Sequence, residues 1–145
     1  MSIDPMEEAY YRYRLAIQHF NRARRLYELN DWVGTVQFAQ MAIENFAKTL
    51  IALFEIPTWS HDPSNQLIRL LNRFPDKVTK HIRELAEITR DVAPEHGRST
   101  YGEPSRGLTP NEIYTKSEAK EILEKAEKAK DIVEKVLNTL NIKLH

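Results

Sequence analysis

The chain has 145 residues, a length that suits one domain with one buried core. Its 21 lysines and arginines balance its 21 aspartates and glutamates, which excludes binding to nucleic acid through a large overall positive charge. The chain has no cysteine, which excludes disulfides and thiolate metal sites, and no run of about 18 uncharged apolar residues. We therefore expect a single domain over residues 1–145, cytoplasmic and without a membrane span.

Apolar residues at three- and four-residue spacing predict four long or medium helices and one short one. The first spans about residues 5–29, with Pro5 at its first helical position. The second spans about residues 32–54 and is apolar on most sides, which indicates a central helix wrapped by its neighbours. Its narrow polar stripe consists of Gln37, Gln40, Glu44 and Lys48.

Prolines mark the next two helices. Asp62 and Pro63 form a cap and a first helical residue, and they open a short helix that ends at Pro75. A fourth helix runs from about residue 76 to 92, and Pro94 stops it.

The segment 93–114 holds three of the four glycines and three of the seven prolines. We expect a long irregular loop there, with one helical turn that begins at Thr109. The last helix begins at Thr115 and carries an apolar seam that suits either antiparallel packing or a dimer contact. The expected fold is therefore all-α: an up-and-down antiparallel bundle of about five helices with a long loop before the last.

Arg90 and His96 lie on either side of the proline that stops the fourth helix. A guanidinium stabilises charge on phosphoryl oxygens, and an imidazole moves a proton near neutral pH, so the two together suit a metal-free phosphodiester site. Asp91 would orient one of them. The alternative is that Arg90 only compensates the negative end of the helix and His96 is an exposed loop residue.

The loop that follows carries a second set of candidates. Two arginines, two hydroxyls and an aromatic ring in a glycine-containing loop could bind phosphate and stack a base. These residues are Arg98, Ser99, Thr100, Tyr101 and Arg106. An ordinary solvated loop is the alternative.

Glu44 and Lys48 are four residues apart on the central helix, in the order that favours an intrahelical ion pair. A catalytic acid at Glu44 is the alternative to this structural pair. No two histidines lie at a metal-ligand spacing with a nearby carboxylate, so we expect neither a metal site nor a cofactor.

These segments together resemble HEPN domains. The run FAQMAIENFAKTLIAL (residues 38–53) is similar to the HEPN second-helix pattern A-x-x-x-E-x-x-x-K, with Glu44 and Lys48 in position and Gln40 in place of the alanine. Residues 60–71 are similar to the short third helix of that family. Arg90-Asp91-x4-His96 resembles its Arg-x4-6-His motif.

The resemblance implies a helical bundle that forms a homodimer. Many HEPN proteins act as metal-independent endoribonucleases in toxin–antitoxin or defence systems, and others bind nucleotides or nucleic acid beside a small nucleotidyltransferase. Carried over, Arg90 and His96 would be the catalytic pair, supported by Asp91, with Tyr101 as a phosphate or antitoxin-modification site. Toxins of that group favour a tyrosine two residues beyond the histidine, where this chain has Arg98.

Three functions follow from these observations. The first is a HEPN protein that binds nucleotide or RNA, with Arg98, Ser99, Tyr101, Arg106 and the Glu44–Lys48 pair as candidate contacts. The second is an active metal-independent endoribonuclease that uses Arg90 and His96. The third is a helical adaptor that dimerises and contacts a partner protein, for which substitutions along the apolar seam of the last helix would matter.

Overall fold

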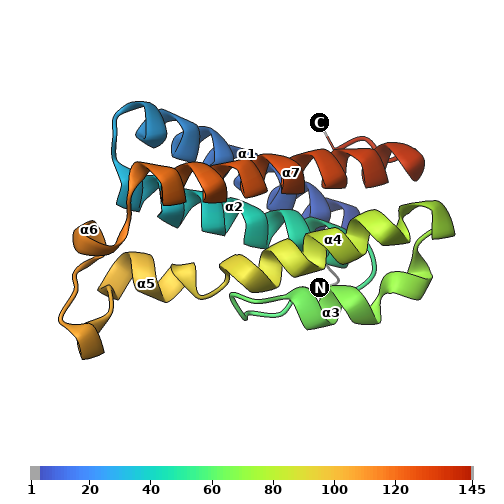
Figure 1. Cartoon of the computed structure of the whole chain (residues 1–145). Coiled ribbons are helices and arrows are strands. Elements are labelled where there is room, and N and C mark those ends of the chain that lie inside the picture. Colours follow the sequence, from blue (N-terminus) through green and yellow to red (C-terminus); the bar gives the residue numbers. More distant parts are fainter. Residues whose placement is uncertain (1–3, 145) are drawn as a thin grey trace.

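A computed structural model describes residues 4–144 of the chain, and within that range it has seven α-helices, two short 3-10 turns and no strand (Figure 1). The expected all-α helical fold is confirmed. The long and medium helices are α1 (Pro5–Glu28), α2 (Trp32–Ala52), α4 (Asp76–Val92) and α7 (Lys116–Thr139). The shorter elements are α3 (Ser64–Arg69), η1 (Leu71–Arg73), α5 (Glu95–Tyr101), η2 (Pro104–Arg106) and α6 (Pro110–Ile113).

The central position expected for α2 is confirmed. It contacts α1, α7, α4, α3 and α5, and most of its side chains are buried (Figure 1). Because α2 is apolar almost all round, it loses the most apolar surface to water when helices cover every side of it. The Asp31 carboxylate begins the helix by accepting a hydrogen bond from the backbone N–H of Gly34 at 2.8 Å.

The apolar seam of α7 packs within the chain. Five of its residues are fully buried, and α7 contacts α2, α4 and α1. Of the two alternatives for this seam, the structure shows antiparallel packing. The fully buried seam residues are Ala119, Ala126, Ala129, Val133 and Val136.

The short helix α3 begins one residue later than expected. Pro63 is the N-cap rather than the first helical residue, and the Asp62 carboxylate accepts a hydrogen bond from the N–H of Ser64 at 3.0 Å. The aspartate still satisfies one of the free N–H groups at the start of the helix. The segment between α2 and α3 turns back along α2, which brings residues 57–63 close to the middle of that helix (Figure 1).

The expectation of an irregular loop over residues 93–114 is wrong in its first part, where α5 forms. Pro94 ends the hydrogen-bonding pattern of α4, but its own backbone is helical (φ −60°, ψ −21°), so the next helix begins at once. The Tyr114 hydroxyl donates to the Glu95 carboxylate at 2.6 Å and ties the start of α5 to the segment before α7. The helical turn expected at Thr109 is present as α6, with its capping box.

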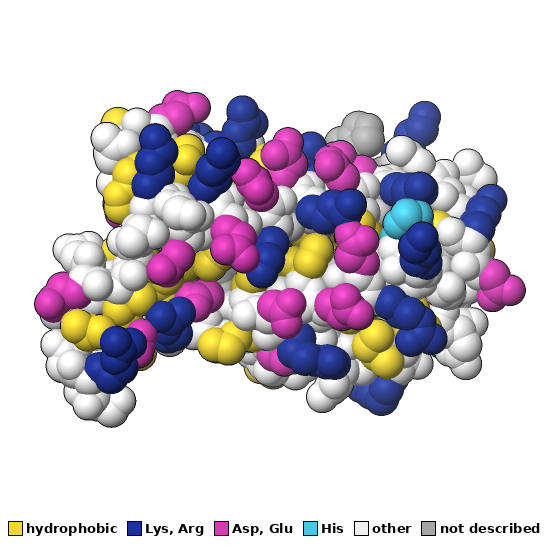
Figure 2. All heavy atoms as spheres, in the orientation of Figure 1, with side chains coloured by type: hydrophobic (Ala, Val, Ile, Leu, Met, Phe, Trp, Pro, Cys, Tyr) yellow, Lys and Arg dark blue, Asp and Glu magenta, His cyan; other side chains and the backbone are white. Residues whose placement is uncertain are grey.

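Charged side chains of both signs are interspersed on the face of the molecule shown in Figure 2, in keeping with the balanced composition. Within residues 4–144, no helix combines the length and the apolar character that a bilayer crossing requires. Because the charges of the chain are balanced, any anion site must be a local arrangement of a few groups.

Candidate functional site

The polar stripe of α2 forms the floor of the candidate site, and Glu44 is at its centre. The Glu44 carboxylate accepts hydrogen bonds from the Lys48 ammonium at 3.0 Å, the Gln40 amide at 3.3 Å and the His61 ring at 3.1 Å. Glu44, Lys48 and Gln40 are buried. A buried charge is tolerated only when it is paired and hydrogen-bonded, and here three donors converge on one carboxylate.

His96 reaches this stripe from α5. Its Nδ1 lies 3.0 Å from Oε1 of Gln40. Because an amide oxygen only accepts hydrogen bonds, Nδ1 carries the proton, and the lone pair of the neutral ring is on Nε2. The Gln40 amide is itself oriented by its N–H donation to Glu44, so the stripe sets the tautomer of His96.

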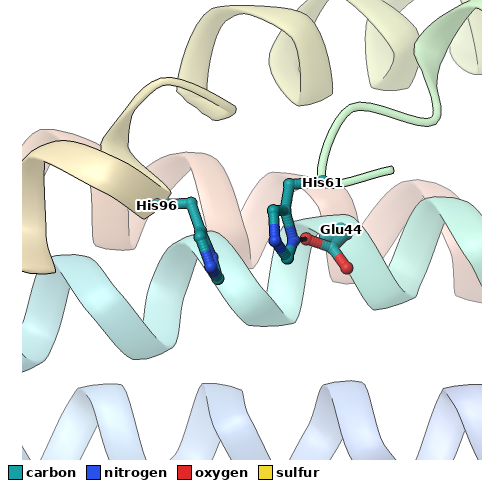
Figure 3. A group of neighbouring side chains, drawn as sticks. All are labelled: Glu44, His61 and His96. Carbon is teal, nitrogen blue, oxygen red and sulfur yellow. Dashed lines mark hydrogen bonds and ion pairs between the residues drawn. The ribbon is translucent and has the colours of Figure 1, made fainter. Parts of the chain in front are cut away.

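His61 comes from the segment between α2 and α3 and stacks on His96. The two ring centroids are 3.5 Å apart and the rings are inclined by only 19° (Figure 3). Nδ1 of His61 donates to Glu44, while just over half of its side-chain surface (54%) is open to solvent. Folding therefore brings together two imidazoles that are 35 positions apart in the sequence.

The surroundings of His96 favour its neutral form. Burial lowers the pKa of His96 below the usual imidazole value, the neighbouring His61 lowers it further, and the Glu44 carboxylate offsets part of the change. At pH 7 the ring is therefore uncharged, with a free lone pair that can accept a proton or a hydrogen bond.

A pocket of about 210 Å³ opens beside His96, between α2 and α5. The Gln37 amide donates to the backbone carbonyl of Ser99 at 3.0 Å and fixes the two helices on either side of it. The Ser99 side chain is buried, and its hydroxyl hydrogen-bonds the carbonyl of His96. The pocket is lined by Gln37, Met41, His96, Ser99 and Thr100.

Arg90 lies in the last turn of α4 and contacts α3 rather than His96. Its guanidinium donates to the Ser64 hydroxyl and to the Asn65 amide oxygen, both at 3.3 Å. Among the described residues, no hydrogen bond or ion pair joins Arg90 to His96, and the exposed Asp91 carboxylate forms none with either. The sequence predicted that these three side chains form one site. In the structure, only His96 is hydrogen-bonded to the polar stripe of α2.

The guanidinium of Arg98 is engaged by two carboxylates. It pairs with Glu95 and, at 2.9 Å, with Glu103, and both contacts raise the pKa of Arg98. Arg106 also pairs with Glu103 at 2.9 Å, and these bonds lower the pKa of that carboxyl. Arg98 also lies over the Tyr114 ring at 5.5 Å. This network braces α5 and leaves Arg98 less available to a phosphate than the sequence suggested.

Two residues of the site were missed by the sequence analysis. Gln40 appeared in the polar stripe of the second helix and as a departure from the HEPN helix pattern, and the structure shows that its longer side chain reaches both Glu44 and His96. His61 was included only in residues 60–71, the stretch that is similar to the short third helix of HEPN domains. Its signal lay in the polar sequence Ser60-His61-Asp62 just before a helix, but no spacing rule links it to position 96.

Glu44, His61 and His96 are also the described residues that could hold a metal ion. They offer ligand atoms that all lie within 4.8 Å of one another. Two histidines and a carboxylate are a common ligand set for Zn²⁺. However, the lone pairs of an imidazole lie in the plane of its ring, so two stacked rings cannot both point at one ion. Metal binding would require one ring to turn.

The HEPN domain model matches residues 9–136, which is nearly the whole chain. No curated protein and no solved structure gives a significant match. The all-helical fold of residues 4–144 agrees with that match, because HEPN domains are helical. The chain belongs to the HEPN domain family.

Proposed function

We propose that this HEPN protein binds RNA or a nucleotide, with a phosphate group beside His96. Membership of the family supports a nucleotide- or RNA-related function in general. The observation that carries the proposal is the position of His96: the polar stripe of α2 holds it in one tautomer, at the edge of a pocket. A fixed imidazole with a free Nε2 lone pair, beside the exposed Thr100 hydroxyl, suits a ribose hydroxyl next to a phosphate.

Exposed aromatic rings near the site support a single-stranded ligand. Trp59 is 93% exposed and precedes His61 by two residues, while Tyr101 is 75% exposed and follows the pocket residue Thr100. Bases that are not paired stack on such rings with little preference for sequence. The proposed ligand is therefore single-stranded RNA rather than a duplex.

Binding of a fluorescein-labelled single-stranded RNA, followed by anisotropy at several salt concentrations, tests this proposal. We expect Arg90→Ala to weaken binding by about 10-fold, which is the loss expected for one hydrogen bond to a charged group. His96→Ala should weaken it by about 5-fold, because the Nε2 lone pair loses a hydrogen bond from a ribose hydroxyl. Arg83→Ala, which removes another exposed arginine of α4, is the matched control and should leave affinity unchanged. Equal affinity in all four proteins would contradict the proposal.

A second candidate function is metal-independent RNA cleavage, and the lowered pKa of His96 favours it. A neutral imidazole can take the proton of a ribose 2′-hydroxyl, whose oxygen then attacks the adjacent phosphorus. The bond from phosphorus to the 5′-oxygen of the next nucleotide breaks, that oxygen takes up a proton, and a 2′,3′-cyclic phosphate remains. We expect cleavage of single-stranded RNA to persist in EDTA and to disappear in His96→Ala. Cleavage that needs a divalent ion, or that survives this substitution, would exclude the mechanism.

A toxin–antitoxin or defence setting with a small nucleotidyltransferase partner is part of the same proposal. Its support is the family match and the exposed hydroxyl-bearing ring of Tyr101, which a modifying enzyme could reach. A nucleotidyltransferase encoded next to this protein should co-purify with it, or transfer a nucleotide to it, and Tyr101→Phe should abolish that transfer. Transfer that persists in the variant would remove Tyr101 from this role.

A further inference from the structure

We propose that α1 provides a second phosphate-binding site for the same RNA strand, centred on the guanidinium of Arg22. The inference rests on the proposed binding function and deepens it, because it predicts where the strand runs after it leaves the pocket beside His96. From that pocket the strand crosses the exposed surface of α2, and a later phosphate of its backbone binds to α1.

The charge of α1 differs from that of the chain as a whole. Between Glu8 and Glu28 the helix has five arginines and no acidic residue. Among residues 4–144, Arg12 is the one arginine of this set with a carboxylate at ion-pair distance, that of Glu8 at 3.0 Å. The second half of α1 is therefore a local cationic surface on a chain without net charge. The five arginines are Arg12, Arg14, Arg22, Arg24 and Arg25.

A pocket of about 360 Å³ lies on this part of α1. Its lining residues recur at three- and four-residue spacing, so they share one face of the helix. Besides two arginines, this face offers the side-chain amides of Gln18 and Asn21, which can donate hydrogen bonds to phosphate oxygens. An anion in the pocket therefore meets two cations and two neutral donors. The pocket is lined by Gln18, His19, Asn21, Arg22 and Arg25.

Arg22 is held in place by an aromatic ring of α2. Its guanidinium carbon lies 5.0 Å from the centre of the Phe38 ring. The quadrupole of the ring attracts the cation, and this contact leaves the N–H donors of the guanidinium free to bind an anion. The His19 ring packs on the same phenylalanine, with the two centroids 5.6 Å apart. Burial lowers the pKa of His19 and Arg22 lowers it further, while Glu44 offsets part of the change, so Arg22 supplies the charge here.

Partly exposed side chains of α2 join this pocket to the one beside His96. Phe38 and Met41 are three positions apart on the helix, so their side chains are neighbours. Met41 lines the pocket beside His96, and Phe38 contacts Arg22. α1 runs along one side of α2, while α5 lies on the other (Figure 3). The two sites are therefore separated by about 10–12 Å, the width of one helix with its side chains, which a strand of a few nucleotides spans.

The test compares a short RNA with a longer one. A dinucleotide fills only the pocket beside His96, whereas a single strand of about 10 nucleotides reaches both sites. We expect Arg22→Ala to weaken binding of the longer strand about 10-fold at low salt, and to leave dinucleotide binding, measured by NMR titration, unchanged. The slope of log affinity against log salt for the longer strand should become shallower by about 0.7, the value for one lost phosphate contact on a single strand.

Arg24→Ala is the matched control. Arg24 is also exposed and also lies over a ring, that of Phe20 at 5.8 Å, but it does not line this pocket. Its substitution removes the same charge and should leave the affinity for both RNAs as in the wild type. Arg22→Lys keeps the charge without the planar guanidinium and should recover only part of the affinity. Each variant changes an exposed side chain, so each should keep the wild-type circular dichroism spectrum.

The outcomes separate this inference from the proposed function. If His96→Ala weakens binding of the longer strand and Arg22→Ala does not, the second site is overturned and the proposed function stands. An equal loss in Arg22→Ala and Arg24→Ala would also overturn the site, because it would indicate a general attraction between charges. A wild-type protein that binds neither RNA would overturn both proposals.

Discussion

Glu44 and Lys48 illustrate how much one pair of buried charges contributes to this protein. Their side chains are separated by 3.0 Å and are 10% and 4% exposed, respectively. The sequence predicted the ion pair from its spacing alone. The structure adds that the same carboxylate also accepts from Gln40 and His61, so the pair is part of the site as well as of the core.

We expect Lys48→Met to lower the free energy of unfolding by about 3 kcal/mol, because it leaves the Glu44 carboxylate buried with fewer donors. The measurement is urea unfolding followed by circular dichroism. Lys125→Met is the matched control: Lys125 pairs with Glu121 at 3.7 Å on the surface of α7, and its removal should cost less than about 0.5 kcal/mol. If Glu44→Gln does not recover part of the loss when combined with Lys48→Met, the buried charge is not its cause.

At the scale of single residues, the sequence predicted His96 and the Glu44–Lys48 pair as candidates but not the arrangement that connects them. Spacing rules work within one helix, where residues four apart lie on one face. His61 and His96 meet only because a connecting segment folds back over α2. A tertiary contact of this kind produces no periodic pattern in the sequence. A direct contact between Arg90 and His96 was expected because the two residues are close in the sequence. In the structure, α5 turns the histidine toward α2 instead.

Among the helices, α5 determines where His96 points, and a glycine ends it. Gly102 has φ +74°, and a Cβ there would lie 2.1 Å from the backbone oxygen of Leu108. The backbone at this point crosses closely, with hydrogen bonds between Glu103 and Leu108 at 2.8 and 3.1 Å. Only glycine satisfies both the left-handed conformation and the close approach.

Gly102→Ala should therefore disturb the end of α5, whereas Gly107→Ala should be tolerated. Gly107 also has a positive φ (+69°), but nothing lies within 4 Å of its added Cβ, so its substitution should cost about 1 kcal/mol. We expect a clearly larger loss for Gly102→Ala, together with weaker RNA binding. Thermal unfolding and anisotropy check the two effects, and equal melting temperatures for the two variants would contradict the argument.

The long helices were predictable because each carries many apolar residues at regular spacing, and α1, α2, α4 and α7 lie close to their expected bounds. α5 was not, because its seven residues are few for a periodic pattern and Pro94 suggests an end as much as a beginning. The tie from Tyr114 to Glu95, which helps to hold this short helix, spans 19 positions.

For the molecule as a whole, we propose that the chain forms a homodimer, as its resemblance to HEPN proteins implied. The buried seam of α7 is not available for this contact, so the interface must use another surface. Exposed apolar side chains occur at Leu29, Ile56, Trp59 and Tyr101. Sedimentation velocity at micromolar concentration should give about twice the 17.0 kDa chain mass. A single species at the chain mass would contradict this proposal.

The helix that supplies the core also carries the ionisable floor of the pocket, which constrains how this protein can be engineered for heat resistance. Replacing a buried ion pair with apolar side chains of similar volume often makes a protein more stable. Glu44→Leu combined with Lys48→Met would be such a replacement. It would remove the carboxylate that accepts hydrogen bonds from the Gln40 amide and from His61, and through Gln40 it would also affect His96. We therefore expect selection for a higher melting temperature alone to yield a more stable protein that no longer binds its ligand.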